Sequence, residues 1–274
     1  MSLKTKKTQR LGNKKLYLCL PFATPVKTSN WMTCYMKNNR LFNFGFLATI
    51  ASSLVLFFLG CNSGEGNPKI DEGTISYEIS YPGRPEGGML DGVLPREMKM
   101  QFQKSRYVNT ISAAGMFESK LIADCKAKTV TFTFNFGPKK IYATIPEAVA
   151  DSLLNAQFSI PNLIDVRGME EVAGYDCERT FAVFDQLEDG PDFEVKFTSD
   201  IQISNPNWCN QFKYLEAVML EYEVKQYGLR LKLKAKEINS DPVNGNAFEI
   251  SQDFKKVSIA EMIYEFEEVF KNFQ

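Results

Sequence analysis

The residues that could carry chemistry in this chain are its carboxylates and cysteines, because it contains no histidine. Histidine is the usual general base near neutral pH and the commonest metal ligand, so its absence excludes serine–histidine and cysteine–histidine nucleophile systems. The acidic run from Asp185 to Asp192 lacks the alternating ligand order of a calcium loop, and we interpret it as a hairpin loop. The sequence also has no Gly-rich phosphate loop. It therefore predicts a protein that is not an enzyme and uses no cofactor or metal.

The chain has six cysteines: Cys19, Cys34, Cys61, Cys125, Cys177 and Cys209. The first two precede a candidate export signal, and Cys61 ends it. No two of the six have the close spacing of a zinc knuckle. An oxidising compartment permits one disulfide and one free thiol among the last three, and the sequence does not select the pair.

Residues 36–61 have the pattern of a lipoprotein export signal. A short basic start, Met36–Arg40, precedes nineteen uncharged residues, Leu41–Leu59, and then Gly60 and Cys61. A basic start, an apolar middle and a small residue at the cleavage point are typical of a secretory signal. Gly60 and Cys61 match the end of a bacterial lipobox, so we expect Cys61 to be lipidated. An uncleaved anchor is the alternative, because a membrane-spanning helix needs roughly 20 apolar residues.

The signal divides the chain into four expected segments. Residues 1–35 are a spurious or disordered N-terminal extension, and residues 36–60 are the signal peptide. Residues 61–73 are the lipidated cysteine and a flexible tether, and residues 74–274 form a single domain. Both interpretations of the signal place this domain outside the inner membrane. We therefore expect a cell-envelope lipoprotein, anchored to the membrane through Cys61, that faces the periplasm or lies on the outer membrane.

The charge balance changes at the same boundary. Residues 1–60 hold nine basic residues and no acidic one, which leaves 23 of the 32 basic and all 33 acidic residues to residues 61–274, a net charge of −10. Nucleic acids and anionic lipid surfaces recruit Lys and Arg. An acidic body therefore argues against a nucleic-acid partner, and the sequence identifies no partner protein.

Beyond the tether, apolar and polar residues alternate with a period of two. The alternation is clearest over residues 74–81, 98–103, 129–136 and 193–198. This period is typical of antiparallel strands with one face toward the core and one toward water. The sequence therefore predicts a mainly antiparallel β (α+β) fold, a single curved sheet or half-barrel.

One hairpin can be placed in register. A two-residue turn at 227–228 sets Val224 opposite Leu231 on one face and Glu223 opposite Lys232 on the other. The basic stripe on the second strand could indicate an anion site. Because carboxylates face it across the hairpin, we interpret the stripe as part of a solvated outer face; its residues are Arg230, Lys232, Lys234 and Lys236.

We expect two or three helices to close the sheet. Residues 146–155 begin with a proline in the first turn and predict a short helix, and residues 205–214 predict a shorter turn. Ser258 and Glu261 form a capping box. The apolar residues that follow recur at three- and four-residue intervals, which predicts a C-terminal amphipathic helix.

The inward face of the sheet has two alternative interpretations. One is a dry core, and the protein is then a structural or interaction lipoprotein that acts through a partner protein. The other is a cavity for a lipid or another apolar ligand, since Met and Phe suit adaptable apolar pockets. In that case the Gly/Pro-rich segment 82–95 is a flap at its mouth or an ordinary crossover. The candidate ligand-binding residues are Met98, Met100, Phe102, Phe132, Phe134 and Phe136.

Several short motifs occur in a fixed order along residues 73–250: Gly73–Ile79, Val172–Cys177, Val195–Ile201, Asn205–Asn207, Leu220–Tyr222 and Ala235–Ile238. This order resembles the uncharacterised exported lipoproteins of the GLPGLI type and related domain-of-unknown-function families. Tyr214–Leu220, where the naming motif should lie, keeps only its hydrophobic outline. Such proteins are similar in architecture to LolA- and LppX-type half-barrels. The resemblance implies a curved sheet closed by helices, handling of a lipophilic ligand, and no established catalytic residues.

Overall fold

The computed structural model describes residues 67–84, 92, 94–113, 115, 117–184, 191–226 and 229–271. The extension 1–35, the signal 36–60 and Cys61 lie outside the described residues. So do most of the Gly/Pro-rich segment 82–95, most of the acidic run 185–192 and the turn at 227–228. In the part of the chain that the structure describes, no helix has both the length and the apolar character needed to cross a membrane.

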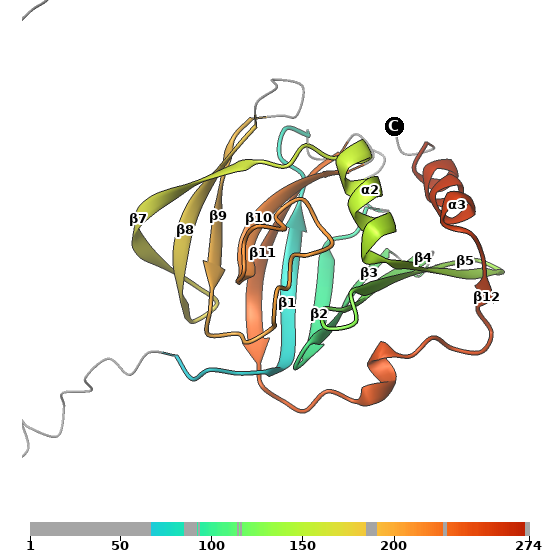
Figure 1. Cartoon of the computed structure of the whole chain (residues 1–274), viewed down its shortest axis with the longest axis horizontal. Helices are drawn as coiled ribbons and strands as arrows, with labels where there is room; N and C mark the ends of the chain where they lie inside the picture. The colour runs from blue at the N-terminus through green and yellow to red at the C-terminus, as the bar shows by residue number, and fades with distance from the viewer. Residues whose placement is uncertain are drawn as a thin grey trace, which may run out of the picture. The chain divides into compact units, whose positions relative to one another are not determined.

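In the described part of the chain, twelve strands form one sheet, which confirms the predicted fold class (Figure 1). The order of the strands is β12-β6-β5-β4-β3-β2-β1-β11-β10-β9-β8-β7. All neighbours pair antiparallel except β12 with β6. The strands are β1 (Glu72–Ser80), β2 (Glu97–Gln103), β3 (Arg106–Ala113), β4 (Phe117–Asp124), β5 (Thr129–Phe136), β6 (Lys139–Pro146), β7 (Asn162–Val172), β8 (Tyr175–Val183), β9 (Phe193–Thr198), β10 (Val218–Gln226), β11 (Leu229–Asn239) and β12 (Lys255–Lys256).

Two meanders meet at β1. Strands β2 to β6 follow one another on one side, and β7 to β11 follow one another on the other. Strand β1 pairs with β2 and with β11, and so joins the two halves. The chain passes from β6 to β7, at opposite ends of the sheet, through helix α2 (Glu147–Gln157). Helix α2 therefore lies over one face of the sheet, along the path that the chain takes from one half to the other (Figure 1).

The predicted hairpin register is confirmed in β10 and β11. Val224 pairs with Leu231, Tyr222 with Leu233, and Glu223 with Lys232. The register follows from the sequence because shifting it by one residue would move every apolar side chain of the hairpin to the opposite face.

Both predicted helices form. Helix α2 covers the segment expected at 146–155 and runs two residues further. Helix α3 (Ile259–Lys271) follows Ser258, whose Oγ accepts a hydrogen bond from the backbone N–H of Glu261 at 3.1 Å. This contact is one half of the predicted capping box. Residues 205–214 form turns, as the sequence indicated.

The segment between β11 and α3 wraps around one edge of the sheet. Its 3-10 helix η2 (Gly245–Phe248) buries Phe248 together with Val243 against Val108 of β3. Strand β12 then pairs with β6 at the edge, and α3 buries Met262 on the opposite face, against Phe134 and Ala143. We call residues 240–257 the strap. We expected the outer face of the sheet to be open to solvent. This expectation was wrong for β3 to β6, because the strap covers part of their outer face.

Candidate ligand-binding cavity

The inner face of the sheet and the two helices bound a cavity of about 350 Å³. Ligand pockets in proteins have volumes of roughly 300–1,000 Å³. Strands β2 to β6, β10 and β11 supply one wall, and α2, α3 and the segment 209–212 supply the other. Six half-buried side chains of the sheet that line it are Ile111, Leu121, Phe132, Tyr222, Val224 and Leu231.

These six side chains are only half-buried, although they point to the inside of the fold. The contrast is clearest on β10. Tyr222 and Val224 face the cavity and are only half-buried, whereas Glu221 and Glu223 on the outer face are buried. Apolar side chains that face inward but keep accessible surface lack packing partners on one side. The cavity is therefore a space between the sheet and the helices that the described side chains do not fill.

The helices are held over the sheet at its margins. On α2, Ala150 and Leu154 are buried, and Ala150 packs with Val130 of β5 and Ile145 of β6. On α3, Met262 is 1 % exposed, and the Phe266 ring contacts the Phe134 ring. Because both helices pack near β5 and β6, the inner face of β10 and β11 is left uncovered by them. This offset leaves space for the cavity.

The predicted ligand-binding residues have three different positions. Met98 and Phe132 line the cavity. Met100 and Phe102 are buried in the main core and do not reach it. Phe134 is fully buried beneath α3, and Phe136 is 39 % exposed and stacks on Phe134. The structure thus brings two of the six residues to the cavity.

Sequence reasoning missed the contribution of β10 and β11. Tyr222, Val224 and Leu231 line the cavity, and the hairpin register had already placed them on one face. That register was the signal that could have identified them. The segment 209–212 also lines the cavity, and its turn structure gives no periodicity from which its direction could be inferred.

Every described side chain that lines the cavity is uncharged. Several of the polar ones are already hydrogen-bonded. The Tyr81 hydroxyl donates to the Pro95 carbonyl at 2.7 Å, and Ser119 Oγ donates to the Thr133 carbonyl at 3.1 Å. The Tyr107 hydroxyl lies 3.4 Å from Cys209 Sγ. In contrast, Oδ1 of Asn109 is buried and has no hydrogen-bond partner.

The titratable groups of the cavity stay neutral. Burial raises the pKa values of the Tyr107 and Tyr222 hydroxyls well above their ordinary value, and burial raises the pKa of the Cys209 thiol to about 11. A thiol with a raised pKa is a poor nucleophile at neutral pH. Among the described residues, no three Cys, Asp or Glu side chains come together as a metal site. The arrangement favours binding over covalent chemistry.

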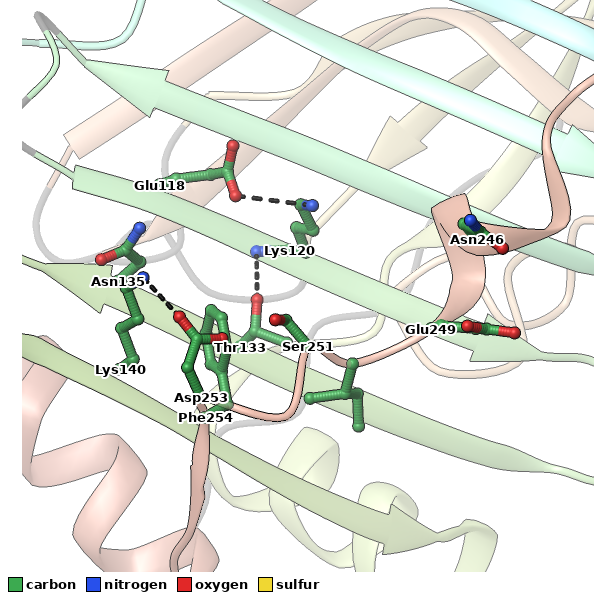
Figure 2. A pocket seen from close by; sticks show the side chains of 11 residues that line it. Glu118, Lys120, Thr133, Asn135, Lys140, Asn246, Glu249, Ser251, Asp253 and Phe254 are labelled. Carbon is green, nitrogen blue, oxygen red and sulfur yellow. Dashed lines mark hydrogen bonds and ion pairs between the residues drawn. The ribbon is translucent and has the colours of Figure 1, made fainter.

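A second hollow, of about 400 Å³, lies between the strap and the outer face of β4 to β6. Its lining contains both polar and apolar side chains, and four of the charged ones form two pairs, Lys120 with Glu118 and Lys140 with Asp253. Figure 2 shows Lys140 beside Asp253, and Lys120 Nζ lies 3.5 Å from a carboxylate oxygen of Glu118. The Thr133 hydroxyl accepts a hydrogen bond from the Lys120 backbone N–H. We interpret this hollow as a gap in the packing of the strap against the sheet and not as a ligand site.

The predicted pairing of the basic stripe with carboxylates is confirmed. Lys232 Nζ lies 2.6 Å from Glu221, Lys236 Nζ lies 2.7 Å from Glu78, and Arg230 pairs with Glu223. The face is less solvated than expected, however, because Glu221 and Glu223 are buried, as is Lys196 of the adjacent β9. The stripe is therefore an ion-paired surface and not an anion site.

Comparisons with known proteins leave the cavity as the main guide to function. No protein-family model matches the chain, and no curated protein matches it at a significant level.

Proposed function

We propose that this protein is a membrane-tethered lipoprotein of the cell envelope, without enzymatic activity, that binds a lipid or another apolar ligand in the cavity beneath α2 and α3. The observation that supports this proposal is the gap of about 350 Å³ lined by half-buried apolar side chains. Filling such a gap would remove that apolar surface from water, at roughly 25 cal/mol per Å². The resemblance to exported half-barrel lipoproteins points to the same class of ligand.

The tether is supported by the sequence of residues 36–61. The membrane anchor is a lipid on Cys61, and the ligand site faces the periplasm or lies on the outer membrane. Labelled palmitate should be incorporated into the wild type and not into a Cys61→Ala variant. An intact Leu41–Leu59 segment in the mature protein, found by mass spectrometry, would contradict this part of the proposal.

Ligand binding can be tested with the full chain in lipid nanodiscs and the neutral apolar dye N-phenyl-1-naphthylamine. Val224 lines the cavity, so Val224→Trp should fill part of it and reduce dye binding. Val149 lies on the exposed side of α2 and outside the cavity, so Val149→Trp is the matched control. Partition of the dye into the nanodisc lipid is common to both variants and cancels in the comparison. Equal dye binding by the two variants and the wild type would contradict the proposal.

An interaction role is the second candidate, and one observation favours it. Strand β7 is the last strand of the sheet, and its Ile164 and Met169 are 56 % and 60 % exposed. Open sheet edges can add a strand from a partner protein. In this case Ile164→Asp should abolish a specific crosslink in intact envelopes and leave dye binding unchanged.

A further inference from the structure

Asn109 carries a polar atom in the cavity lining that has no hydrogen-bond partner. Asn109 lies in the middle of β3, with Met100 of β2 opposite it on one side and Leu121 of β4 on the other. Its side chain lines the cavity, and its Oδ1 is buried without a hydrogen-bond partner. Buried polar atoms are nearly always hydrogen-bonded, so an unpaired one at a cavity wall requires an explanation. A hydrogen-bond donor on a bound ligand would supply the missing partner.

The charge of the lining restricts the ligand further. Among the residues that the structure describes, no Asp, Glu, Lys or Arg side chain lines the cavity. An ionised group inside it would lose its hydration and gain no counter-ion, which strongly disfavours its burial. The part of the ligand that enters the cavity must therefore be uncharged.

Asparagine is well suited to such a contact. Its terminal torsion is soft, so the amide can turn toward a ligand while the strand stays fixed. The amide offers both an acceptor and a donor, and it cannot ionise. Its neighbours Ile111, Leu121 and Phe132 are apolar, so the amide is a polar group within an apolar part of the lining.

We propose that the cavity selects a neutral amphiphile, one that carries a hydroxyl or an amide N–H on an apolar chain and donates a hydrogen bond to Asn109. This inference rests on the proposed function and adds the chemical class of the ligand. It distinguishes neutral lipids from free fatty acids, whose carboxylate is ionised at neutral pH and meets no cation among the described lining residues.

The test compares probes of equal length on the full chain in nanodiscs, by displacement of N-phenyl-1-naphthylamine at neutral pH. Dodecanol offers the donor, undecyl methyl ether lacks it, and dodecanoic acid carries the charge. One net hydrogen bond corresponds to a factor of about five in affinity. We expect dodecanol to bind about fivefold more tightly than the ether and more tightly than the acid.

Two Asn→Leu variants assign the effect to its residue. Asn109→Leu should remove the preference for dodecanol over the ether. Asn135→Leu, on the outer face of β5 and outside the cavity, should keep it. Since the probes are first compared on the wild type, the inference stays testable if Asn109→Leu fails to fold.

The outcomes separate the two proposals. Dye binding with equal affinity for alcohol, ether and acid would overturn the present inference and leave the proposed function intact. A preference for the acid, or a preference for the alcohol that survives in Asn109→Leu, would also overturn it. Absence of binding by the dye and by every probe would overturn both proposals.

Discussion

The ring of Phe266 on α3 lies 4.7 Å from the ring of Phe134 on β5, measured between ring centroids. Phe134 is fully buried, so this contact fixes the helix to a buried part of the sheet. Met262, one turn earlier, is buried in the same cluster, and Lys139 pairs with Glu265 on the helix. Helix α3 also forms a wall of the cavity. Loss of these helix–sheet contacts would therefore both destabilise the fold and change the shape of the cavity.

Replacing Phe266 with Ala should therefore destabilise the fold and open the cavity. Full burial makes Phe→Ala cost roughly 3–5 kcal/mol, and for the half-buried Phe266 we expect about 2 kcal/mol. Urea unfolding followed by circular dichroism measures this loss, and the dye assay should show weaker binding. Tyr264→Ala is the control, because Tyr264 is 56 % exposed on the same helix. Equal effects of the two substitutions would show that α3 is not held by its ring contact.

The parts of the fold that the sequence predicted depend on local patterns. Alternation over 74–81 and the register of Val224 with Leu231 need only neighbouring residues and one turn, and both β1 and the hairpin are found as expected. The central place of β1 depends on its pairing with β2 and β11, which are far apart in the chain. No local pattern specifies that pairing.

The candidate site was less predictable than the fold for the same reason. Met98 and Met100 alternate on one face of β2, yet only Met98 reaches the cavity. Met100 lies opposite Ile75 of β1, and its Sδ is 3.9 Å from the Tyr77 hydroxyl. Tertiary packing thus decides which inward residues are covered. The burial of Val243 and Phe248 in the strap was also not predictable, since both lie outside any segment with apolar periodicity.

Gly73 occupies a position that no larger residue fits. A Cβ at this position would lie 2.2 Å from the carbonyl oxygen of Asn239 on β11, which is backbone and cannot move aside. Gly73→Ala should therefore force β1 and β11 apart and destabilise the protein by about 3 kcal/mol. The urea midpoint measures this effect. Gly245→Ala has open space around the new methyl group and should change the midpoint little. A Gly73→Ala protein as stable as Gly245→Ala would contradict the close approach.

The three described cysteines should be unreactive thiols in the folded protein. In the structure Cys125, Cys177 and Cys209 are free, and no two of them are joined in a disulfide. Burial raises the pKa of Cys125 to about 12 and that of Cys177 to about 11, so little thiolate is present at neutral pH. Peptide mapping after maleimide treatment should find these positions unlabelled in the native protein and labelled in urea. Rapid native labelling, or a disulfide between any two of them, would be inconsistent with this arrangement.

Glu221 is the centre of the ion pairs on the outer face. Its carboxylate lies 2.6 Å from Lys232 and 3.3 Å from Lys196, and Lys196 is itself buried. Glu221→Gln would leave Lys196 paired with Glu170, 2.6 Å away. Removing one member of a buried pair is costly, and we expect a loss of about 2 kcal/mol. Glu78→Gln removes an exposed pair with Lys236 and should have little effect. Similar urea midpoints for the two variants would contradict a special role for Glu221.

The same carboxylate should make stability depend on acid pH. Burial acts to raise the pKa of Glu221, but the hydrogen bond from Lys232 and the charge of Lys196 outweigh it, so the pKa lies below its ordinary value of 4.5. In the unfolded chain Glu221 takes up its proton at higher pH than in the folded protein. Its stabilising contribution is therefore complete above pH 4.5 and is lost as the pH falls through the folded pKa. The hydrogen bond from Lys196 similarly lowers the pKa of Glu170. The urea midpoint of the wild type should decrease once the pH is lowered below 4.5. The midpoint of Glu221→Gln should decrease less steeply over the same pH range. Parallel pH profiles for the two proteins would show that Glu221 contributes nothing to the acid transition.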